Sequence, residues 1–159
     1  MKIREIMTTN CAVCGPHANA AAIAEILWSR DCGSVPIVDE RGILLGIVTD
    51  RDLTIALGTR DRRASTIRAD ECMTRDVETC NPDEDIADAL EVMLARRVRR
   101  VPIVDRNGHL EGMVSLSDIV QASSRPGASI PASSLVKAMA RIEDRSAPRQ
   151  NPKLAAAAK

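Results

Sequence analysis

The sequence is almost devoid of aromatic residues, with one tryptophan, Trp28, and neither tyrosine nor phenylalanine. Proteins bind single-stranded nucleic acid largely by stacking bases on aromatic rings, so this scarcity counts against nucleic-acid binding. The charges point the same way, because 22 basic residues balance 22 acidic residues and leave no net field that attracts a polyanion. We therefore expect no nucleic-acid partner, although one local basic cluster contains Arg96, Arg97, Arg99 and Arg100.

Long apolar runs are also missing. No stretch approaches the roughly 20 apolar residues of a transmembrane helix, and the N-terminus lacks the apolar segment of a secretory signal. The five cysteines are odd in number, which predicts reduced thiols rather than a disulfide framework. We expect a cytoplasmic protein without membrane association.

The chain is rich in internal repetition. Met7-Thr8 recurs as Met73-Thr74, and the string Val-Pro-Ile-Val-Asp at residues 35–39 recurs at residues 101–105. The matches keep one constant spacing without a gap, so the chain contains two copies of one structural unit. A composition of 45% hydrophobic and 28% charged residues is that of a folded globular protein.

Each copy carries local patterns for the order β-α-β-β-α. Short alternating segments predict the first strand, apolar residues at helical spacing predict the first helix, and two apolar runs around a turn predict a hairpin. A second helix starts where the hairpin ends. The first copy places these elements at 11–14, 18–30, 35–38, 43–48 and from 50 onward, and the second copy at 77–80, 83–97, 101–104, 110–114 and from 116 onward.

A unit of this size is too small to bury a stable core alone, so we expect the two to pack sheet to sheet as an α/β (α+β) fold. We assign repeat 1 to residues 1–58, a polar linker to 59–70 and repeat 2 to 71–123. The pattern then breaks, and residues 124–159 form a C-terminal extension. Apolar residues at helical spacing predict one helix over 133–144, followed by a disordered tail.

Each second hairpin strand runs into its helix through a hydroxyl residue that an aspartate follows three positions later. The pairs are Thr49 with Asp52 and Ser115 with Asp118. A hydroxyl and the unsatisfied amides of a first helical turn suit a phosphate, and a carboxylate suits the two hydroxyls of a ribose. The same pattern is also an ordinary helix N-cap that needs no ligand. The residues alone leave both interpretations open.

The order of these motifs resembles the cystathionine-β-synthase (CBS) domain, whose tandem pair is called a Bateman module. The resemblance covers roughly residues 3–122 and rests on Ile6-Met7-Thr8, the duplicated Val-Pro-Ile-Val-Asp strand and two endings in which Gly and two apolar residues precede Thr/Ser-x-x-Asp. It implies two repeats related by a pseudo-twofold axis, with two clefts that bind AMP, ADP, ATP or S-adenosylmethionine. It also implies a homodimer, often a flat disc.

In the family, the aspartate of one repeat holds the ribose while the first strand of the other repeat contacts the base through its backbone. The cleft that we favour is similar to the nucleotide-binding end of the γ subunit of AMP-activated protein kinase, and it takes Thr8, Asn10, Ala12, Arg100, Ser115, Ser117 and Asp118. A second ligand site takes Thr49, Arg51, Asp52, Thr74 and Asp76. Phosphate binding is expected to be weaker there, because Ser34 replaces Arg100 and Glu78 adds an acid.

No set of residues provides a nucleophile with a base, paired catalytic carboxylates or a metal cluster, so we expect no enzyme and no cofactor. The nucleotide is expected to act as a regulatory ligand that biases the arrangement of the repeats presented to a separate effector protein. One alternative is a dimerisation module without a ligand. Another is a metal-responsive module using Cys11, Cys14 and His17, but residues three apart on a strand face opposite ways, so we expect no metal.

Overall fold

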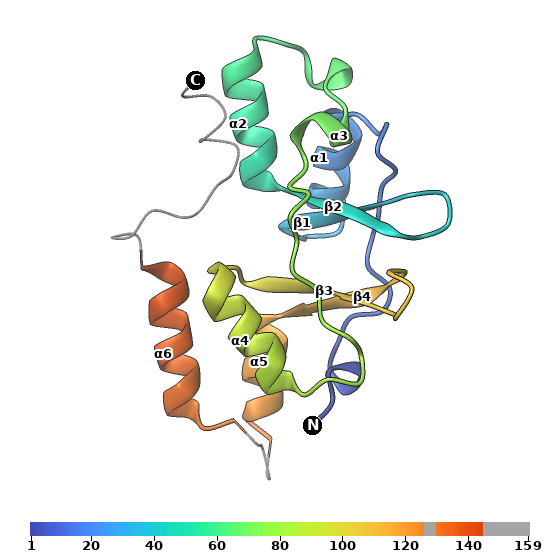
Figure 1. The fold of residues 1–159 in the computed structure, drawn as a ribbon. Helices are drawn as coiled ribbons and strands as arrows, with labels where there is room; N and C mark the ends of the chain where they lie inside the picture. Colours follow the sequence, from blue (N-terminus) through green and yellow to red (C-terminus); the bar gives the residue numbers. More distant parts are fainter. Residues whose placement is uncertain (126–129, 145–159) are drawn as a thin grey trace.

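Two small antiparallel sheets lie face to face in the middle of the molecule, and helices cover their outer sides (Figure 1). The computed structural model describes residues 1–125 and 130–144. Repeat 1 contributes the hairpin of β1 (Ser34–Val38) and β2 (Leu44–Thr49), and repeat 2 contributes β3 (Arg100–Val104) and β4 (Leu110–Ser115). The centre of β1 and that of β3 are buried on both faces, as expected for strands between a helical layer and a second sheet.

The predicted helices follow and precede these hairpins as the sequence indicated, which confirms the α+β fold. Helix α2 begins directly after Thr49, and α5 begins directly after Ser115. Asn19 caps the helix before β1, because its side chain accepts a hydrogen bond of 2.9 Å from the amide of Ala22. The α-helices of the two repeats are α1 (Ala20–Ser29), α2 (Asp50–Arg60), α3 (Ala69–Cys72), α4 (Ile86–Arg96) and α5 (Leu116–Ser123).

The first strand predicted for each repeat is wrong in extent. It is reduced to one residue, since Cys14 forms an isolated parallel bridge with Ile37 and Cys80 forms the same bridge with Ile103. The reason is a crossing of the chain between the repeats. Thr8 is held at the edge of β4 in repeat 2, so the residues that follow must cross to repeat 1 instead of running along either sheet.

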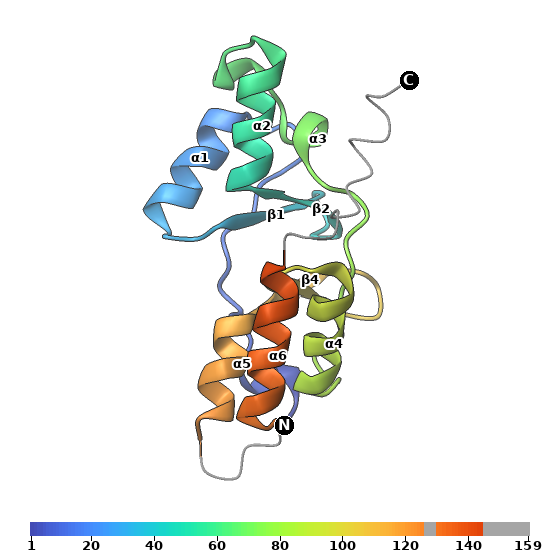
Figure 2. The same cartoon turned by 90° about the vertical axis from the view of Figure 1, so that its left-hand side faces the viewer.

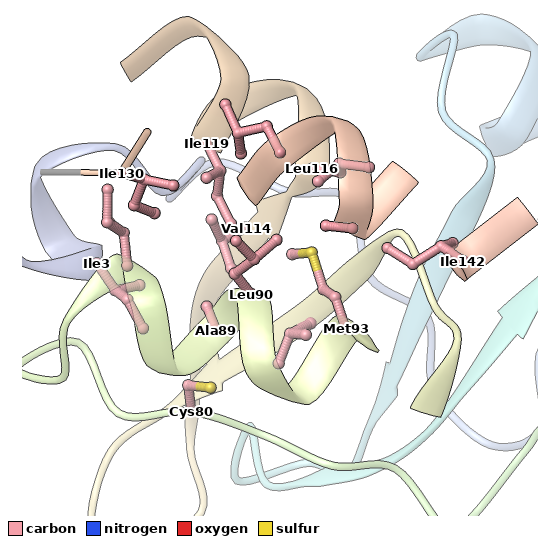
Figure 3. Close-up of a cluster of buried hydrophobic side chains, with 14 of the residues drawn as sticks. Ile3, Cys80, Ala89, Leu90, Met93, Val114, Leu116, Ile119, Ile130 and Ile142 are labelled. Carbon is pink, nitrogen blue, oxygen red and sulfur yellow. The ribbon is translucent and has the colours of Figure 1, made fainter. Parts of the chain in front are cut away.

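The two hydrophobic cores do not follow the sequence boundaries of the repeats. Ile3 is completely buried in the core of repeat 2, among Leu90 and Ile119 (Figure 3). Conversely, Ile67 and Met73 are buried in the core of repeat 1. Each spatial unit is therefore completed by the segment that precedes the other repeat in the sequence.

The segment 59–70 is more ordered than a polar linker. It contains the end of α2, a 3-10 turn at Ala64–Thr66 and the start of α3. The carbonyl of Ile67 accepts a hydrogen bond of 2.8 Å from the amide of Ala20, which fastens the segment to the start of α1. Its apolar residues supply part of the core of repeat 1. The many charged residues around them made this contribution hard to predict from the sequence.

The C-terminal extension contains a helix, α6 (Ala132–Glu143), close to the predicted range of 133–144. It lies against α4 and α5 on the outer side of repeat 2 (Figure 2). Leu135, Ala138 and Ile142 enter the core of that repeat. The predicted disordered tail lies outside the described residues. Within residues 1–125 and 130–144, no helix has the length and apolar character needed to cross a membrane.

Candidate functional site

The crossing segment before each repeat is held against the second hairpin strand of the opposite repeat. The backbone amide of Thr8 donates a hydrogen bond of 2.9 Å to the carbonyl of Met113, and the carbonyl of Thr8 accepts one of 3.0 Å from the amide of Met113. Thr74 exchanges two bonds of 2.9 Å with Ile47 in the same way. These bridges bring each Met-Thr pair to the strand that ends in a Thr/Ser-x-x-Asp motif.

The glycine of each motif is explained by this close approach. A Cβ atom at Gly112 would lie 2.6 Å from the carbonyl oxygen of Thr8, and one at Gly46 would lie 2.5 Å from that of Thr74. Both distances are shorter than van der Waals contact, so a side chain at either position would push the crossing segment away from the sheet. The absence of a side chain at Gly112 and Gly46 therefore lets the crossing segment pack directly against the strand and form one side of each inter-repeat junction.

The hydroxyl and carboxylate of each motif form a capping box at the start of a helix. Ser115 donates to Oδ2 of Asp118 through its amide at 2.8 Å and its hydroxyl at 2.6 Å, and the amide of Asp118 donates back to Oγ at 3.2 Å. Thr49 and Asp52 repeat this geometry with distances of 3.0, 2.8 and 3.2 Å. The helix-cap interpretation is thus confirmed, and the cap occupies the hydroxyls that a phosphate was expected to use.

The first-turn amides of α5 are also partly occupied. The amide of Leu116 donates to the carbonyl of Arg99 at 2.9 Å, and that of Asp118 is taken by the cap. Ser117 lies exposed on the same turn, where its hydroxyl faces solvent. An anion at this end of the helix would therefore depend on side chains more than on the backbone.

Arg100 reaches from repeat 2 to repeat 1. It lies opposite Ser115 in the β3–β4 ladder, and its guanidinium nitrogen Nη1 is 3.0 Å from where a Cβ atom of Gly33 would be. Its side chain is half-buried, and among the described residues no carboxylate forms an ion pair with it. The nearby arginines do have acidic partners: Arg96 pairs with Asp76 and Glu78, Arg97 with Asp144, and Arg99 with Glu143.

Gly33 is the residue of this junction that sequence reasoning missed. Repeat 1 has Gly33-Ser34 before its Val-Pro-Ile-Val strand, whereas repeat 2 has Arg99-Arg100 at the same place. A side chain at position 33 would occupy the space that the Arg100 guanidinium uses. This difference between the repeats was the signal in the sequence that could have indicated Gly33, but only the structure shows that Gly33 and Arg100 lie next to each other.

The structure thus brings four of the predicted residues, Thr8, Arg100, Ser115 and Asp118, to the end of β4. Asn10 and Ala12 lie farther along the crossing segment, on its way from Thr8 to Cys14, with Asn10 exposed and Ala12 half-buried.

The second junction differs in charge from the first. Ser34 lies opposite Thr49, so no arginine is present at the position of Arg100. Asp76 and Glu78 on the crossing segment are held by Arg96 of α4, with distances of 3.4 Å from Nη1 to Asp76 and 3.1 Å from Nε to Glu78. Of the other predicted residues here, Thr74 bridges to Ile47, and Arg51 is exposed on the first turn of α2.

Two hollows in the described surface lie away from the end of β4. One of about 430 Å³ lies on repeat 2, beside Arg4, Met7 and Asp83. Another of about 200 Å³ adjoins the second junction, where Gly46 and Leu45 face Val77 and Thr79. The Arg100 side chain fills the space beside Gly33, so a ligand at the first junction requires this flexible side chain to turn.

The predicted metal alternative finds little support in the chemistry of its residues. Partial burial raises the pKa of the Cys11 thiol, although its own backbone opposes the shift, and burial also raises the pKa of Cys14. A raised pKa disfavours the thiolate that binds metal. His17 lies 3.9 Å from the carboxylate of Asp70. In the part of the chain that the structure describes, no three His, Cys, Asp or Glu side chains gather as metal ligands.

Comparison with known proteins identifies the family. The sequence model of the CBS domain matches residues 3–59 and 69–125. An uncharacterized 17.7 kDa protein of Acidianus ambivalens is 33% identical over 121 residues, which cover 76% of this chain and 72% of that protein. Among solved structures, the CBS domain pair of protein MJ0100 in complex with 5'-methylthioadenosine and S-adenosylmethionine is similar at 28% identity.

That structure has a TM-score of 0.69 and the match covers 76% of this chain and 94% of the other. Hypoxic Response Protein I, solved with two coordinated zinc ions, is similar at 29% identity and a TM-score of 0.70, over 76% of this chain and 98% of its own. The duplicated motifs, the crossing segments and these matches agree, and the chain belongs to the CBS-domain family as a tandem pair of CBS domains.

Proposed function

We propose that this chain is a regulatory, non-catalytic module that binds an adenine nucleotide, AMP, ADP, ATP or S-adenosylmethionine, at the junction formed by Arg100, Ser115 and Asp118. The observation that carries the proposal is Arg100 itself. A half-buried guanidinium without an acidic partner in the described chain is costly to keep, unless an anion neutralises it. The CBS pair of MJ0100, which is bound to two adenine nucleosides, supports the choice of ligand.

The roles of the side chains follow from the capping box. Both bonds from Ser115 go to Oδ2 of Asp118, so the ribose hydroxyls would donate to Oδ1. A phosphate or carboxylate of the ligand would accept hydrogen bonds from the Arg100 guanidinium and from the exposed Ser117 hydroxyl. The base would lie along the crossing segment, beside Thr8, Asn10 and Ala12.

The second junction is proposed as a weaker site. It keeps Thr49, Asp52 and Thr74, and a hollow of about 200 Å³ with a mixed polar and apolar lining is available nearby. It lacks a cation at position 34, and its crossing segment carries two carboxylates, Asp76 and Glu78, that share one guanidinium, Arg96. Repulsion between this acidic edge and a phosphate would reduce affinity.

The mechanism is a shift of population. A nucleotide that contacts both repeats binds best where Arg100 and the crossing segment close on it, and so favours one arrangement of the two sheets. That arrangement is what a separate effector protein would recognise. We also propose a cytoplasmic location, because an odd number of cysteines, five in this sequence, favours reduced thiols over a disulfide framework.

The test is calorimetric titration of the purified protein with AMP, ADP, ATP and S-adenosylmethionine. Asp118→Asn keeps an oxygen for the helix cap but removes the charge that holds the ribose, so affinity should fall by roughly 10- to 100-fold. Asp52→Asn is the matched control, because Asp52 has the same capping role beside the junction that lacks an arginine. It should leave the stronger site unchanged.

Arg100→Ser gives repeat 2 the residue that repeat 1 already has, and affinity for the phosphate-bearing ligands should fall by roughly tenfold. Equal losses in Asp118→Asn and Asp52→Asn would assign the effect to helix capping. Absence of binding by all four ligands would refute the proposal and favour an interaction module without a ligand. Stoichiometric zinc in the purified protein would favour the metal-responsive alternative.

A further inference from the structure

The segment between α2 and α3 carries a concentration of positive charge that neither junction uses. Residues 60–68 include four arginines and one acidic residue, Asp61. The 3-10 turn at Ala64–Thr66 lies in the middle of this stretch, and Ser65 is exposed on it. The turn follows the end of α2, at the outer end of repeat 1 and away from repeat 2 (Figures 1 and 2). One accessible hydroxyl therefore lies in a strongly basic stretch of the chain.

The side chain of Ser65 takes no part in holding the turn together. Ala64 packs against the core of repeat 1. The hydroxyl of Thr66 donates a hydrogen bond of 2.9 Å to the carbonyl of Arg63. The hydroxyl of Ser65, by contrast, makes no hydrogen bond within residues 1–125 and 130–144. A group attached to the Ser65 oxygen would therefore extend into solvent without disturbing the core.

Two arginines stand at a particular spacing before this serine. Arg62 and Arg63 precede Ser65 by three and two positions, and no other serine or threonine in the sequence follows two consecutive arginines at this spacing. A protein kinase with an acidic peptide groove selects its target serine by arginines at these positions, because carboxylates bind the planar guanidinium through two hydrogen bonds. Arg63 is exposed, and no acidic residue of the described chain forms an ion pair with it. The pattern and its exposure therefore suit a kinase of this kind.

A phosphate on Ser65 would find a cation already in place. The Arg62 guanidinium lies over the turn, where it donates to the carbonyl of Thr66 and pairs with Glu71 at 3.0 Å. The phosphate adds a charge of about −1.5 to −2, so it competes with the single charge of Glu71 for this guanidinium. Glu71 also caps α3, because its Oε2 accepts a hydrogen bond of 2.8 Å from the amide of Arg68. The phosphate would therefore act on α3 and on the crossing segment that follows it.

We propose that Ser65 is a phosphorylation site for an arginine-directed serine/threonine protein kinase, and that Arg62 and Arg63 hold the transferred phosphate. In the reaction, Oγ of Ser65 attacks the γ-phosphorus of ATP, the bond between that phosphorus and the bridging oxygen breaks, and ADP leaves with the electron pair. The hydroxyl proton passes to the catalytic aspartate of the kinase. Ser65 lies outside both junctions, so the modification does not depend on nucleotide binding by this chain.

The test is phosphorylation of the full chain by the catalytic subunit of cAMP-dependent protein kinase, which is arginine-directed. Mass spectrometry of the intact chain and of its peptides should find a single phosphate, on Ser65. Ser65→Ala should abolish the reaction, whereas Thr66→Ala, at the neighbouring exposed hydroxyl, is the matched control and should leave it unchanged. A synthetic peptide of residues 59–70 reports the activity of the kinase on the same sequence outside the fold. The proposal is overturned if the kinase modifies the peptide but not the folded chain, if it modifies neither, or if Ser65→Ala accepts as much phosphate as the wild type.

The role of Arg62 is tested by the pH dependence of the phosphorus-31 resonance of the modified chain. The fold holds the Arg62 guanidinium over the turn, and a neighbouring cation favours the dianion. The second pKa of phosphoserine should therefore be lower in the folded chain than in the modified peptide, by roughly 0.2–0.7 pH unit for an exposed ion pair. Arg62→Ala, modified with a higher kinase concentration, should remove most of this difference, whereas Arg41→Ala, at an exposed arginine of the β1–β2 turn, should retain it. Equal pKa values in the folded chain and in the peptide would overturn the assignment of Arg62.

Discussion

Replacing Gly112 by alanine tests whether the crossing segment really completes the opposite repeat. The new Cβ would lie 2.6 Å from the carbonyl oxygen of Thr8, and the two nearest atoms are backbone, which cannot turn aside as a flexible side chain would. Thr8 would have to retreat from β4 by roughly 1 Å to regain normal contact. This movement would stretch the two hydrogen bonds with Met113, now 2.9 and 3.0 Å long.

Two weakened backbone hydrogen bonds cost about 0.5–1.5 kcal/mol each, and forcing a methyl group into a filled space costs about 1–3 kcal/mol. Gly112→Ala should therefore lower the free energy of unfolding by about 2–6 kcal/mol. Urea unfolding measures this as a lower transition midpoint with little change in slope. If Thr8 forms a wall of the nucleotide site, affinity should fall as well.

Gly58→Ala is the control, because no atom lies within 4 Å of the Cβ that it adds. Gly58 is within helix α2, where alanine is preferred by about 0.5–1 kcal/mol, so this variant should be more stable than the wild type. Equal stabilities of Gly112→Ala and the wild type would refute the close approach of Thr8 to β4.

Two further predictions address the core and the pH dependence. Ile3→Ala should lower the free energy of unfolding by about 2–5 kcal/mol, because Ile3 is completely buried in the core of repeat 2 although it is near the N-terminus. A loss below about 1 kcal/mol in thermal or urea unfolding would contradict this packing. Although partial burial opposes the shift, hydrogen bonds from His109 and Asn107 lower the pKa of Asp105 to about 2. Its contribution to stability should be present above about pH 4 and disappear as the pH falls toward 2, so the stability difference between wild type and Asp105→Asn should shrink over that range.

The hairpins and the helices could be predicted from sequence because their determinants are local. Apolar spacing indicated the helices, and the Thr49 and Ser115 caps fixed where α2 and α5 begin. Because the chain is duplicated, the same local patterns occur at equivalent positions in both repeats and support each prediction twice. Local patterns do not show which segment a strand pairs with, and the prediction of the first strand was wrong for this reason. Residues 11–14 alternate like a strand, yet their neighbours direct the chain from one sheet to the other.

Pairing across the repeats was equally inaccessible to the sequence. Ile3 and Ile67 have the character of core residues, but nothing nearby in the chain says which core they enter. For the candidate site, the Ser115-Asp118 pair was visible as a motif, whereas the contact of Arg100 with Gly33 joins residues on different repeats. The capping role was open in the sequence and became definite only when the hydrogen bonds could be traced.

The duplicated fold has acquired two junctions with the same backbone and opposite charge. At the second, Arg96 ties α4 to Asp76 and Glu78 on the crossing segment, which fixes that segment to the helical layer of repeat 2. At the first, the equivalent positions are Asn10 and Ala12, which cannot form such ion pairs, and the cation at the junction is Arg100 instead. A ligand that neutralises Arg100 would therefore act on the crossing segment that lacks an ionic tie to a helix. Any change of arrangement caused by the nucleotide should appear between Thr8 and Cys14 more than between Thr74 and Cys80, and hydrogen exchange of these two segments with and without AMP would distinguish them.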